Sequence, residues 1–546
     1  MKKIEGNIVD VVAREIYPAS LIIENDVIVD VIKNNNIYSE YIIPGFIDSH
    51  VHIESSMLTP SNFSKLVSKN GTVAIVSDPH EIANVLGIEG IKYMINNAKN
   101  ADIKINFTIP SCVPATPLDA SGACISAEDV DKLFKSNNFI GLSEMMNVPG
   151  VLAGDKEVME KINSALKRNL VVDGHAPLLI GEELKKYIAA GISTDHECSE
   201  LDEAREKIYN GMKIIIREGS AAENYEKLKS LIATNSDDLM FCTDDSHPDS
   251  IIKYGGIKKI VKMAIRDGFD IFDVLKIACI NPILHYNLNV GTLKVGDKAD
   301  FIKIENLKSF EVIDTYISGR KIYQNNEFSK STDSTLHVNK EILPNNFNHD
   351  LITKDQLVLS VNKNIYAIGV IPGELLTTKN KVVVEKSDNL ESDISKDLLK
   401  IVYINRYSNS LPQVGYVVGF GFKKGAIASS ISHDSHNIIA VGCSDIEIEH
   451  AVNTIIKNKG GLSVAYKKDN SIFTDELPLP IAGIMSNRDG EYVAKKYSNL
   501  SKLALTLGCK IKAPFMTLAF MSLLVIPEFK IGENGMFDYS KFSFIN

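Results

Sequence analysis

The sequence has few cysteines, and they are widely separated. Its seven cysteines, at positions 112, 124, 198, 242, 279, 443 and 509, include no C-x-x-C pair. A disulfide framework or a zinc ribbon needs closely spaced or regularly paired cysteines, so neither is predicted. Scattered thiols are typical of a reducing compartment, and we expect a cytoplasmic protein.

The chain also lacks long apolar segments and an excess of positive charge. Its first residues are followed by Glu5 and Asp10 rather than by an apolar stretch, so no signal peptide is expected. The uncharged run from Ala513 to Pro527 is shorter than the ~18–20 residues of a membrane-spanning helix, and we expect it in a core. The net charge of −10 argues against nucleic acid or an anionic membrane as the main partner.

What the chain does have is a regular alternation of strand and helix patterns. With 546 residues, about two to four domains are expected. Between residues 44 and 288, apolar β-type runs alternate with segments of helical spacing, which predicts an α/β fold, a (β/α)8 TIM-like barrel. The eight predicted strands are Ile43–Ile47, Thr72–Val76, Ile105–Ile109, Phe139–Leu142, Leu170–Val172, Gly191–Ser193, Lys213–Ile216 and Leu239–Cys242.

The flanking residues predict two further domains. Residues 1–43 and 289–325 both have β-type patterns and together predict a small composite β-sandwich domain. Residues 326–346, rich in Asn, Ser and Thr, predict a linker. Residues 347–546 predict an additional C-terminal α+β domain.

Potential metal ligands follow five of the predicted barrel strands. Catalytic side chains of such barrels stand at the C-terminal ends of the strands, and alternate residues of a strand share a face. Four histidines and two carboxylates at one barrel mouth suit two divalent ions that share a bridging group. The strand ends carry His50 and His52, then Glu144, His175 and His196, and finally the adjacent pair Asp244 and Asp245.

Several segments resemble a known family. Pro44–His52 resembles the first-strand signature of the amidohydrolase superfamily, and Val295–Asp300 resembles the return strand of its composite β domain. The likeness to the bacterial adenine deaminase family extends over nearly the whole chain, including the C-terminal domain. Five segments carry it: His52–Ser56, Ser77–Glu81, Gly141–Asn147, Arg217–Ser220 and Ser432–Asn437.

The resemblance implies an activity and a metal content. It implies hydrolysis of adenine to hypoxanthine and ammonia, a reaction of purine salvage, with adenine as the small-molecule substrate. It also implies two divalent ions per chain, Mn²⁺ or Fe²⁺, with Zn²⁺ as an alternative that the same ligands accept. For the oligomeric state, a homodimer is the common default.

The resemblance also assigns ligands. His50 and His52 would bind one ion together with the aspartate of strand eight, and His175 and His196 would bind the second. Glu144 would bridge the two ions; the absence of lysine from Phe139–Asn147 agrees with this role. Strand alternation and the resemblance both favour Asp244 over Asp245 as the aspartate ligand.

The chemistry predicts further roles. A metal-bridging hydroxide would attack C6 of adenine, and Asp244 can take the proton of the hydroxide and deliver it to the leaving amine. A carboxyl group must also protonate the ring. Glu81, Glu197 and Glu218 are all placed for this, and the sequence does not rank them.

Seven other residues are predicted near the substrate. His80 is predicted to orient substrate, to bind a further ion or to cap a loop, and Arg217 and Ser220 follow strand seven. The segment from His433 to His436 is interpreted as a lid over the pocket, with a separate metal site and a polar turn as alternatives. The predicted substrate-binding set is Glu54, Ser55, His80, Arg217, Ser220, His433 and His436.

Other functions fit less well. His52-Ile53-Glu54 matches H-x-E of zinc nucleobase deaminases, but the P-C-x-x-C run of that motif is absent. His80-Glu81 lacks the second histidine of H-E-x-x-H, so a zincin protease is not predicted. The main alternative is another binuclear amidohydrolase, such as a cyclic amidase or an N-acyl deacetylase. A scaffold without catalysis would not need so costly a polar cluster.

Overall fold

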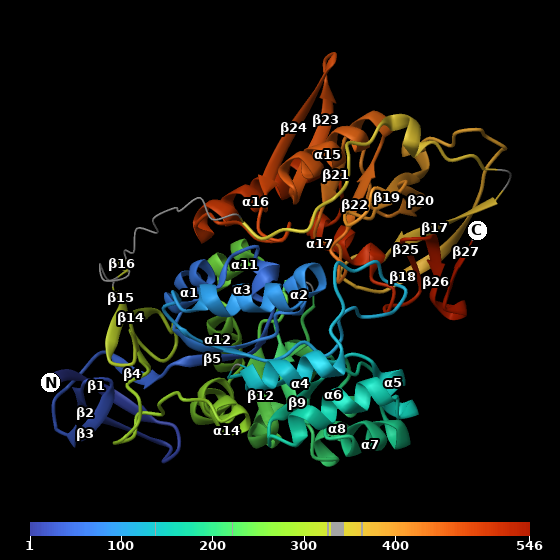
Figure 1. Ribbon diagram of the computed structural model, residues 1–546. Helices are drawn as coiled ribbons and strands as arrows, with labels where there is room; N and C mark the ends of the chain where they lie inside the picture. The colour runs from blue at the N-terminus through green and yellow to red at the C-terminus, as the bar shows by residue number, and fades with distance from the viewer. Residues whose placement is uncertain (137, 221, 325–326, 329–342, 362–363, 546) are drawn as a thin grey trace.

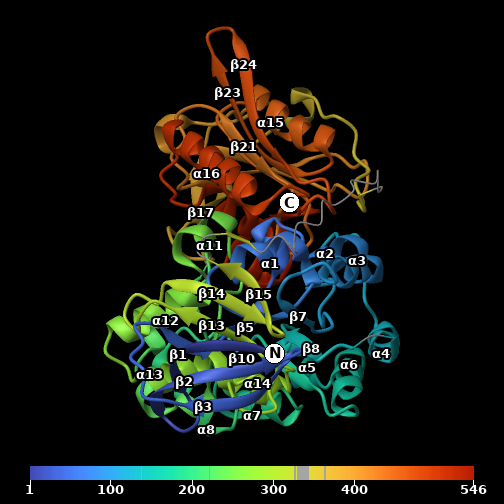
Figure 2. The same cartoon turned by 90° about the vertical axis from the view of Figure 1, so that its left-hand side faces the viewer.

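The computed structural model describes residues 1–546 except 137, 221, 325–326, 329–342, 362–363 and 546. A barrel forms the lower part of the molecule in these views, a small β-sheet domain lies at one side of it, and a C-terminal domain is stacked above it (Figures 1 and 2). Among the described residues, no helix has both the length and the apolar character needed to cross a membrane. The linker predicted at 326–346 lies mostly outside the described residues; residues 327–328 form a short strand.

Eight parallel strands form the predicted TIM-like barrel, which is confirmed. Val, Ile and other apolar residues dominate the strands, and nearly all are buried because both faces of each strand are covered. The strands are β5 (Phe46–Val51), β6 (Thr72–Ser77), β7 (Lys104–Phe107), β8 (Gly141–Met145), β9 (Val171–Gly174), β10 (Thr194–Asp195), β11 (Lys213–Arg217) and β12 (Leu239–Cys242).

Backbone pairing closes the barrel. β5, β6 and β7 pair in parallel, as do β8 with β9 and β10 through β12. Ile109 bridges to Leu142, and Val51 bridges to Asp244, so β12 returns to β5. Closure brings the C-terminal ends of all eight strands to one mouth, where the functional side chains lie.

Helices surround the barrel between the strands. Most of them bury apolar residues on one face; in α12, for example, Ile257, Ile260, Val261 and Ala264 face inward at helical spacing. The helices are α1 (Pro60–Ser68), α2 (His80–Leu86), α3 (Ile88–Ala98), α4 (Ala127–Ser136), α5 (Val148–Ala153), α6 (Lys156–Leu166), α7 (Gly181–Ala189), α8 (Leu201–Tyr209), α9 (Tyr225–Leu228), α10 (Leu231–Thr234), α11 (Pro248–Tyr254), α12 (Ile257–Arg266), α13 (Ile271–Leu275) and α14 (Asn281–Tyr286).

The small domain joins the two ends of the barrel segment. Its sheet has the order β16-β15-β14-β13-β4-β1-β2-β3, so strands from before and after the barrel pair where β4 meets β13. Both halves share one hydrophobic core that includes Ile8, Ile42 and Phe301. The strands are β1 (Lys2–Asp10), β2 (Glu15–Glu24), β3 (Val27–Lys33), β4 (Tyr41–Pro44), β13 (Phe301–Ile304), β14 (Val312–Ile317), β15 (Arg320–Gln324) and β16 (Glu327–Phe328).

The first barrel strand was predicted at the wrong bounds. The run Ile43–Ile47 is divided at Gly45: β4 ends at Pro44 in the small domain, and β5 begins at Phe46 in the barrel. A Cβ atom at Gly45 would lie 2.3 Å from Val73 Cγ1, so only glycine allows the chain to pass so close to β6. The predicted strand Gly191–Ser193 also starts too early, since β10 is Thr194–Asp195.

The C-terminal domain is built on a second eight-stranded sheet, with the order β18-β17-β20-β19-β22-β21-β23-β24. Helix α15 buries Ile448, Val452 and Ile455 against one face of this sheet. Its elements are β17 (Asn364–Val370), β18 (Thr377–Val383), β19 (Leu399–Ile404), β20 (Gln413–Val418), β21 (Ala426–Ser429), β22 (Ile438–Gly442), α15 (Asp445–Asn458), β23 (Gly461–Lys468), β24 (Ser471–Pro478), α16 (Gly490–Thr506), α17 (Pro514–Ala519), β25 (Phe529–Gly532), β26 (Gly535–Asp538) and β27 (Ser543–Ile545).

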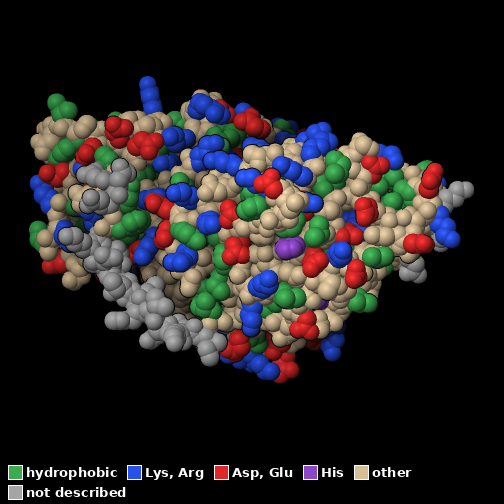
Figure 3. Space-filling view, turned by 90° about the horizontal axis from the view of Figure 1, so that it is seen from above, with side chains coloured by type: hydrophobic (Ala, Val, Ile, Leu, Met, Phe, Trp, Pro, Cys, Tyr) green, Lys and Arg blue, Asp and Glu red, His purple; other side chains and the backbone are tan. Residues whose placement is uncertain are grey.

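The outer face of the C-terminal domain is polar. Seen from above, acidic and basic side chains are interspersed over it (Figure 3). The opposite side of this domain faces the barrel mouth. There Ser486 donates a backbone hydrogen bond to Met57, and Asn437 donates its side-chain amide to the Ala120 carbonyl. The mouth is therefore covered by a domain that contacts its loops directly.

Candidate metal centre

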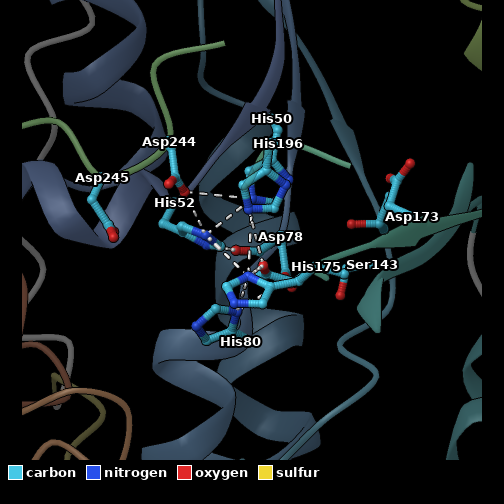
Figure 4. A network of polar contacts seen from close by, with 12 residues as sticks. His50, His52, Asp78, His80, Ser143, Asp173, His175, His196, Asp244 and Asp245 are labelled. Carbon is cyan, nitrogen blue, oxygen red and sulfur yellow. Dashed lines mark hydrogen bonds and ion pairs between the residues drawn. The ribbon is translucent and has the colours of Figure 1, made fainter. Parts of the chain in front are cut away.

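Two imidazoles project from the end of β5 into the barrel mouth. His50 and His52 are both buried, and their Nε2 atoms lie 3.2 Å apart. His52 Nδ1 lies 3.1 Å from the Asp78 carbonyl oxygen. A hydrogen bond donated to that carbonyl leaves the Nε2 lone pair of His52 free to bind a metal. The strand thus presents two nitrogen donors to one point (Figure 4).

The carboxylate of Glu144 lies between two pairs of histidines. Its Oε1 atom is 3.4 Å from His52 Nε2 and 3.9 Å from His50 Nε2. Its Oε2 atom is 2.9 Å from His175 Nδ1 and 3.2 Å from His196 Nε2. Burial raises the pKa of Glu144, but the surrounding imidazoles outweigh burial and hold this pKa well below its usual range. One oxygen faces each pair, the arrangement of a bridging carboxylate.

His175 and His196 follow β9 and β10, and a buried lysine joins their two loops. Lys207 of α8 donates to the Ala176 carbonyl at 2.6 Å and to Asp195 Oδ2 at 2.9 Å. The other Asp195 oxygen accepts from the Ala176 N–H at 2.8 Å. Because Ala176 follows His175 and Asp195 precedes His196, these contacts fix the spacing of the two ligands.

The structure distinguishes the two adjacent aspartates after β12. Asp244 Oδ1 lies 3.1 Å from His52 Nε2 and 3.5 Å from His50 Nε2. Asp245 instead accepts a hydrogen bond from Ser55 at 2.6 Å and lies to one side of the cluster (Figure 4). Asp244 has φ +49°, a left-handed conformation, and its N–H donates to the His50 carbonyl. Asp244 is therefore the better placed ligand.

Arg217 holds Asp244 from the side away from the histidines. Its guanidinium donates to Asp244 Oδ2 at 2.5 Å and to both oxygens of Glu197. Burial lowers the pKa of Arg217, but Glu197 and Asp244 outweigh burial and keep it well above its usual range. Arg217 was predicted to contact substrate; in the structure its guanidinium donates to Asp244, one of the predicted ligands, and to Glu197.

The six predicted ligands form a donor set that fits two divalent ions. We call His50, His52, Glu144, His175, His196 and Asp244 the six-ligand cluster. Their ligand atoms fall into overlapping groups within 4.8 Å, among them His50 with His196 and Asp244, and Glu144 with His175 and His196. Imidazole nitrogens and carboxylate oxygens are ligands of Mn, Fe and Zn, and Glu144, whose two oxygens face different pairs of histidines, would be the residue that two ions share.

Two further potential ligands lie beside the cluster: Asp78, which was not predicted, and His80, for which binding of a further ion was one of three predicted roles. Asp78 and His80 follow β6, and with His52 and Glu144 they form another group of potential ligands. His80 Nδ1 lies 2.9 Å from Asp78 Oδ2 and 3.4 Å from Glu144 Oε1. Asp78 could have been found from the sequence, because a carboxylate directly after a barrel strand satisfies the rule that identified Glu144.

Four more of the predicted residues lie where the mouth meets the C-terminal domain. Glu81 contacts His433 and His436, which come from the C-terminal domain. Glu54 Oε1 accepts a hydrogen bond from the Ile82 N–H. All four side chains are buried.

Two predicted residues have contacts outside the cluster. Glu218 Oε2 lies 2.7 Å from Lys259 of α12, and Glu218 Oε1 accepts from the Tyr225 N–H. The Ser220 hydroxyl accepts from the His247 N–H at 3.0 Å. The structure therefore does not bring Glu218 and Ser220 to the six-ligand cluster.

The chain matches two family models. Residues 41–322 match the amidohydrolase family, which covers the barrel and part of the small sheet domain. Residues 374–543 match the adenine deaminase C-terminal domain.

Similar proteins are known along the full length of the chain. An adenine deaminase of Methanosarcina mazei is 47% identical over 560 residues, covering 100% of this chain and 99% of the relative. An adenine deaminase of Borreliella afzelii is 48% identical over 556 residues with the same coverage. Among solved structures, N-acetyl-D-glucosamine-6-phosphate deacetylase from Mycobacterium smegmatis has a TM-score of 0.44 and 12% identity, covering 59% of this chain and 100% of that one.

Proposed function

The chain belongs to the amidohydrolase family and, within it, to the adenine deaminases, and we propose that its six-ligand cluster serves the hydrolysis of adenine to hypoxanthine and ammonia. The observation that supports this most is the position of Glu144, with one oxygen toward each pair of histidines. The relatives that share the whole chain, including the C-terminal domain, are adenine deaminases.

Two divalent ions fit these residues. His50, His52 and Asp244 would hold one ion, and His175 and His196 would hold the other. Glu144 would contact both ions. Bound ions of this kind lower the pKa of water and supply a hydroxide nucleophile near neutral pH. We propose Mn²⁺ or Fe²⁺, with Zn²⁺ as an alternative, because all three accept imidazole and carboxylate ligands.

Asp244 is proposed to move the proton that the reaction requires. Water must lose a proton as its oxygen adds to C6, and the amine must gain one to leave as ammonia. Asp244 is buried and faces the histidines with Oδ1, while Arg217 holds Oδ2. A carboxylate fixed in this way can accept the first proton and donate it to the amine.

A second carboxylate is proposed to contact the purine ring. Glu81, Glu197 and Glu218 were the predicted residues for this, and both oxygens of Glu197 accept hydrogen bonds from Arg217. Glu218 is paired with Lys259, whereas Glu81 lies 3.7 Å from His80 Nε2, and His80 in turn contacts Glu144. The contacts of Glu81 support its assignment to the substrate.

One assay tests the proposed function. The full chain, loaded with Mn²⁺, is mixed with adenine, and formation of hypoxanthine is followed by ultraviolet absorbance with ammonia measured in parallel. We expect turnover of adenine. If adenine is unchanged while a cyclic amide or an N-acyl sugar or amino acid is hydrolysed, the assignment to adenine is wrong and the alternative amidohydrolase activity holds.

Two coarser proposals concern the molecule as a whole. We propose a homodimer, which sedimentation or size-exclusion chromatography with light scattering tests directly. We also propose a cytoplasmic location, since seven scattered cysteines suit a reducing compartment; fractionation of the source cells tests it.

A further inference from the structure

The C-terminal domain places two imidazoles on one barrel carboxylate. His433 Nδ1 lies 3.1 Å from Glu81 Oε1, and His436 Nε2 contacts Glu81 Oε2. Glu81 is in the first turn of α2, and the two histidines lie in the loop between β21 and β22. All three side chains are buried, with 4% exposure or less. Both oxygens of this carboxylate are thus held by another domain.

The two histidines are themselves held firmly. The ring of His433 stacks on Phe520, with centroids 4.5 Å apart and planes within 12°, and the backbone N–H of His433 donates to the Ala519 carbonyl. The His436 N–H donates to the Ser432 carbonyl at 2.6 Å. Tyr407 anchors the same loop through a hydrogen bond to the Ser435 carbonyl. A loop fixed at so many points can set the direction of Glu81.

Glu81 lies beside the six-ligand cluster, on the side that faces the C-terminal domain. Glu81, His433 and Asp245 each present a ligand atom within 4.8 Å of the others, and Asp245 follows Asp244 directly. Next to His433 is a narrow cavity between the domains, lined by Ser55 and His247 of the barrel and by Tyr497, Phe515 and Met516 of the C-terminal domain.

We propose that His433 and His436 are positioning residues, which hold the Glu81 carboxylate where it accepts a hydrogen bond from an N–H group of the bound purine. A carboxylate offers about four lone-pair sites, and the histidines use two of them. The C-terminal domain is then part of the substrate site rather than only a cover. This inference rests on the proposed function, because it names a substrate contact of that site.

The test distinguishes the effect of the hydrogen bonds that His433 and His436 make with Glu81 from the effect of the volume of their rings. Asn at position 433 keeps a donor near the Nδ1 position, and Gln at position 436 keeps one near Nε2. We expect His433→Asn and His436→Gln to retain kcat/KM for adenine within a few-fold. We expect His433→Ala and His436→Ala to lose about 10- to 100-fold, the effect of one hydrogen bond to a charged group, mainly through a higher KM.

A double-mutant cycle tests whether the histidines act through Glu81. In the Glu81→Gln background, His433→Ala should lower kcat/KM by no more than about two-fold, because the residue that it positions is already altered. His450→Ala is the matched control: this exposed histidine lies on α15 of the same domain, and its removal should leave KM unchanged. Melting temperature and metal content are measured for every variant on the manganese-loaded full chain.

Three results would overturn the proposal. The first is that the losses of kcat/KM in the double-mutant cycle are additive. The second is that His433→Asn and His436→Gln have the same raised KM as the alanine variants. The third is that His433→Ala loses a third metal equivalent, which would assign Glu81 and His433 to a metal site. The proposed function fails separately, if the wild-type chain does not convert adenine.

Discussion

Replacing Lys207 by Met should destabilise the barrel and loosen one half of the metal centre. The ammonium is fully buried and contacts the Ala176 carbonyl, Asp195 and Glu203 at 2.6, 2.9 and 2.7 Å. Methionine has a stem of similar length but no charge. The substitution therefore leaves two buried carboxylates without their cation.

The size of the effect follows from these contacts. Removing one partner of a buried ion pair costs about 3–5 kcal/mol. Burial raises the pKa of Asp195, but Lys207, His196 and the Ala176 N–H together outweigh burial and bring this pKa from 3.8 to about 2, so the folded protein favours the charged carboxylate. At about 2–4 °C per kcal/mol, the melting temperature should fall by about 6–20 °C.

Metal binding provides a second readout. Lys207 fixes the loops of His175 and His196, and loss of such supporting contacts lowers metal affinity about 10- to 100-fold. Scanning calorimetry and titration of the metal-free chain with Mn²⁺ measure the two effects. Lys185→Met is the control, because Lys185 pairs with Glu182 at the surface, with side chains 55% and 82% exposed, and such pairs contribute at most about 1 kcal/mol. If the Lys207→Met protein has the melting temperature and the Mn²⁺ affinity of the wild type, the proposed role of Lys207 is wrong.

Three other results are expected. Asp244→Asn should lower kcat by about 10²- to 10⁴-fold, the usual contribution of a general base, while circular dichroism stays unchanged; near-normal turnover would contradict its role. Chelation should abolish activity and lower the melting temperature, and Mn²⁺ should restore both, because bound ligand stabilises the folded state. Burial lowers the pKa of Lys530 from 10.5 to about 7, so the folded chain binds fewer protons than the unfolded chain between about pH 7 and 10. The free energy of unfolding should therefore rise with pH across this window, and Lys530→Met should remove the rise. If chemical unfolding gives both proteins the same dependence of this free energy on pH, Lys530 does not cause the rise.

The six-ligand cluster could be predicted because each of its residues stands at or just after the C-terminal end of a barrel strand. In a parallel barrel every strand delivers its C-terminal end to the same mouth, so the strand order placed His50, Glu144, His175 and Asp244 together, and the resemblance supplied their expected roles. The choice of Asp244 over Asp245 also agreed with strand alternation. The direction of each strand was enough to place these residues at the barrel mouth, and no knowledge of their side-chain rotamers was required.

Contacts between loops could not be predicted in the same way. The pairing of Arg217 with Glu197 and Asp244 depends on side-chain torsions and on how two loops lie side by side. The contact of Glu81 with His433 joins residues far apart in sequence, on two domains whose packing no local pattern specifies. The break at Gly45 was missed because an apolar run reads as one strand whether or not it changes sheets.

The meeting of β4 with β13 has a consequence for synthesis of the chain. One half of the sheet that these strands join is synthesised before the barrel and the other half after it. The barrel is encoded by the chain between Pro44, the last residue of β4, and Phe301, the first residue of β13. At about 5–20 residues per second, the ribosome needs about 13–50 s to make the intervening chain. During this time β4 has an unpaired edge, and open strand edges favour association between chains. The half-made protein is therefore most prone to aggregate before β13 emerges, and binding of a chaperone to the nascent chain should be concentrated in that interval.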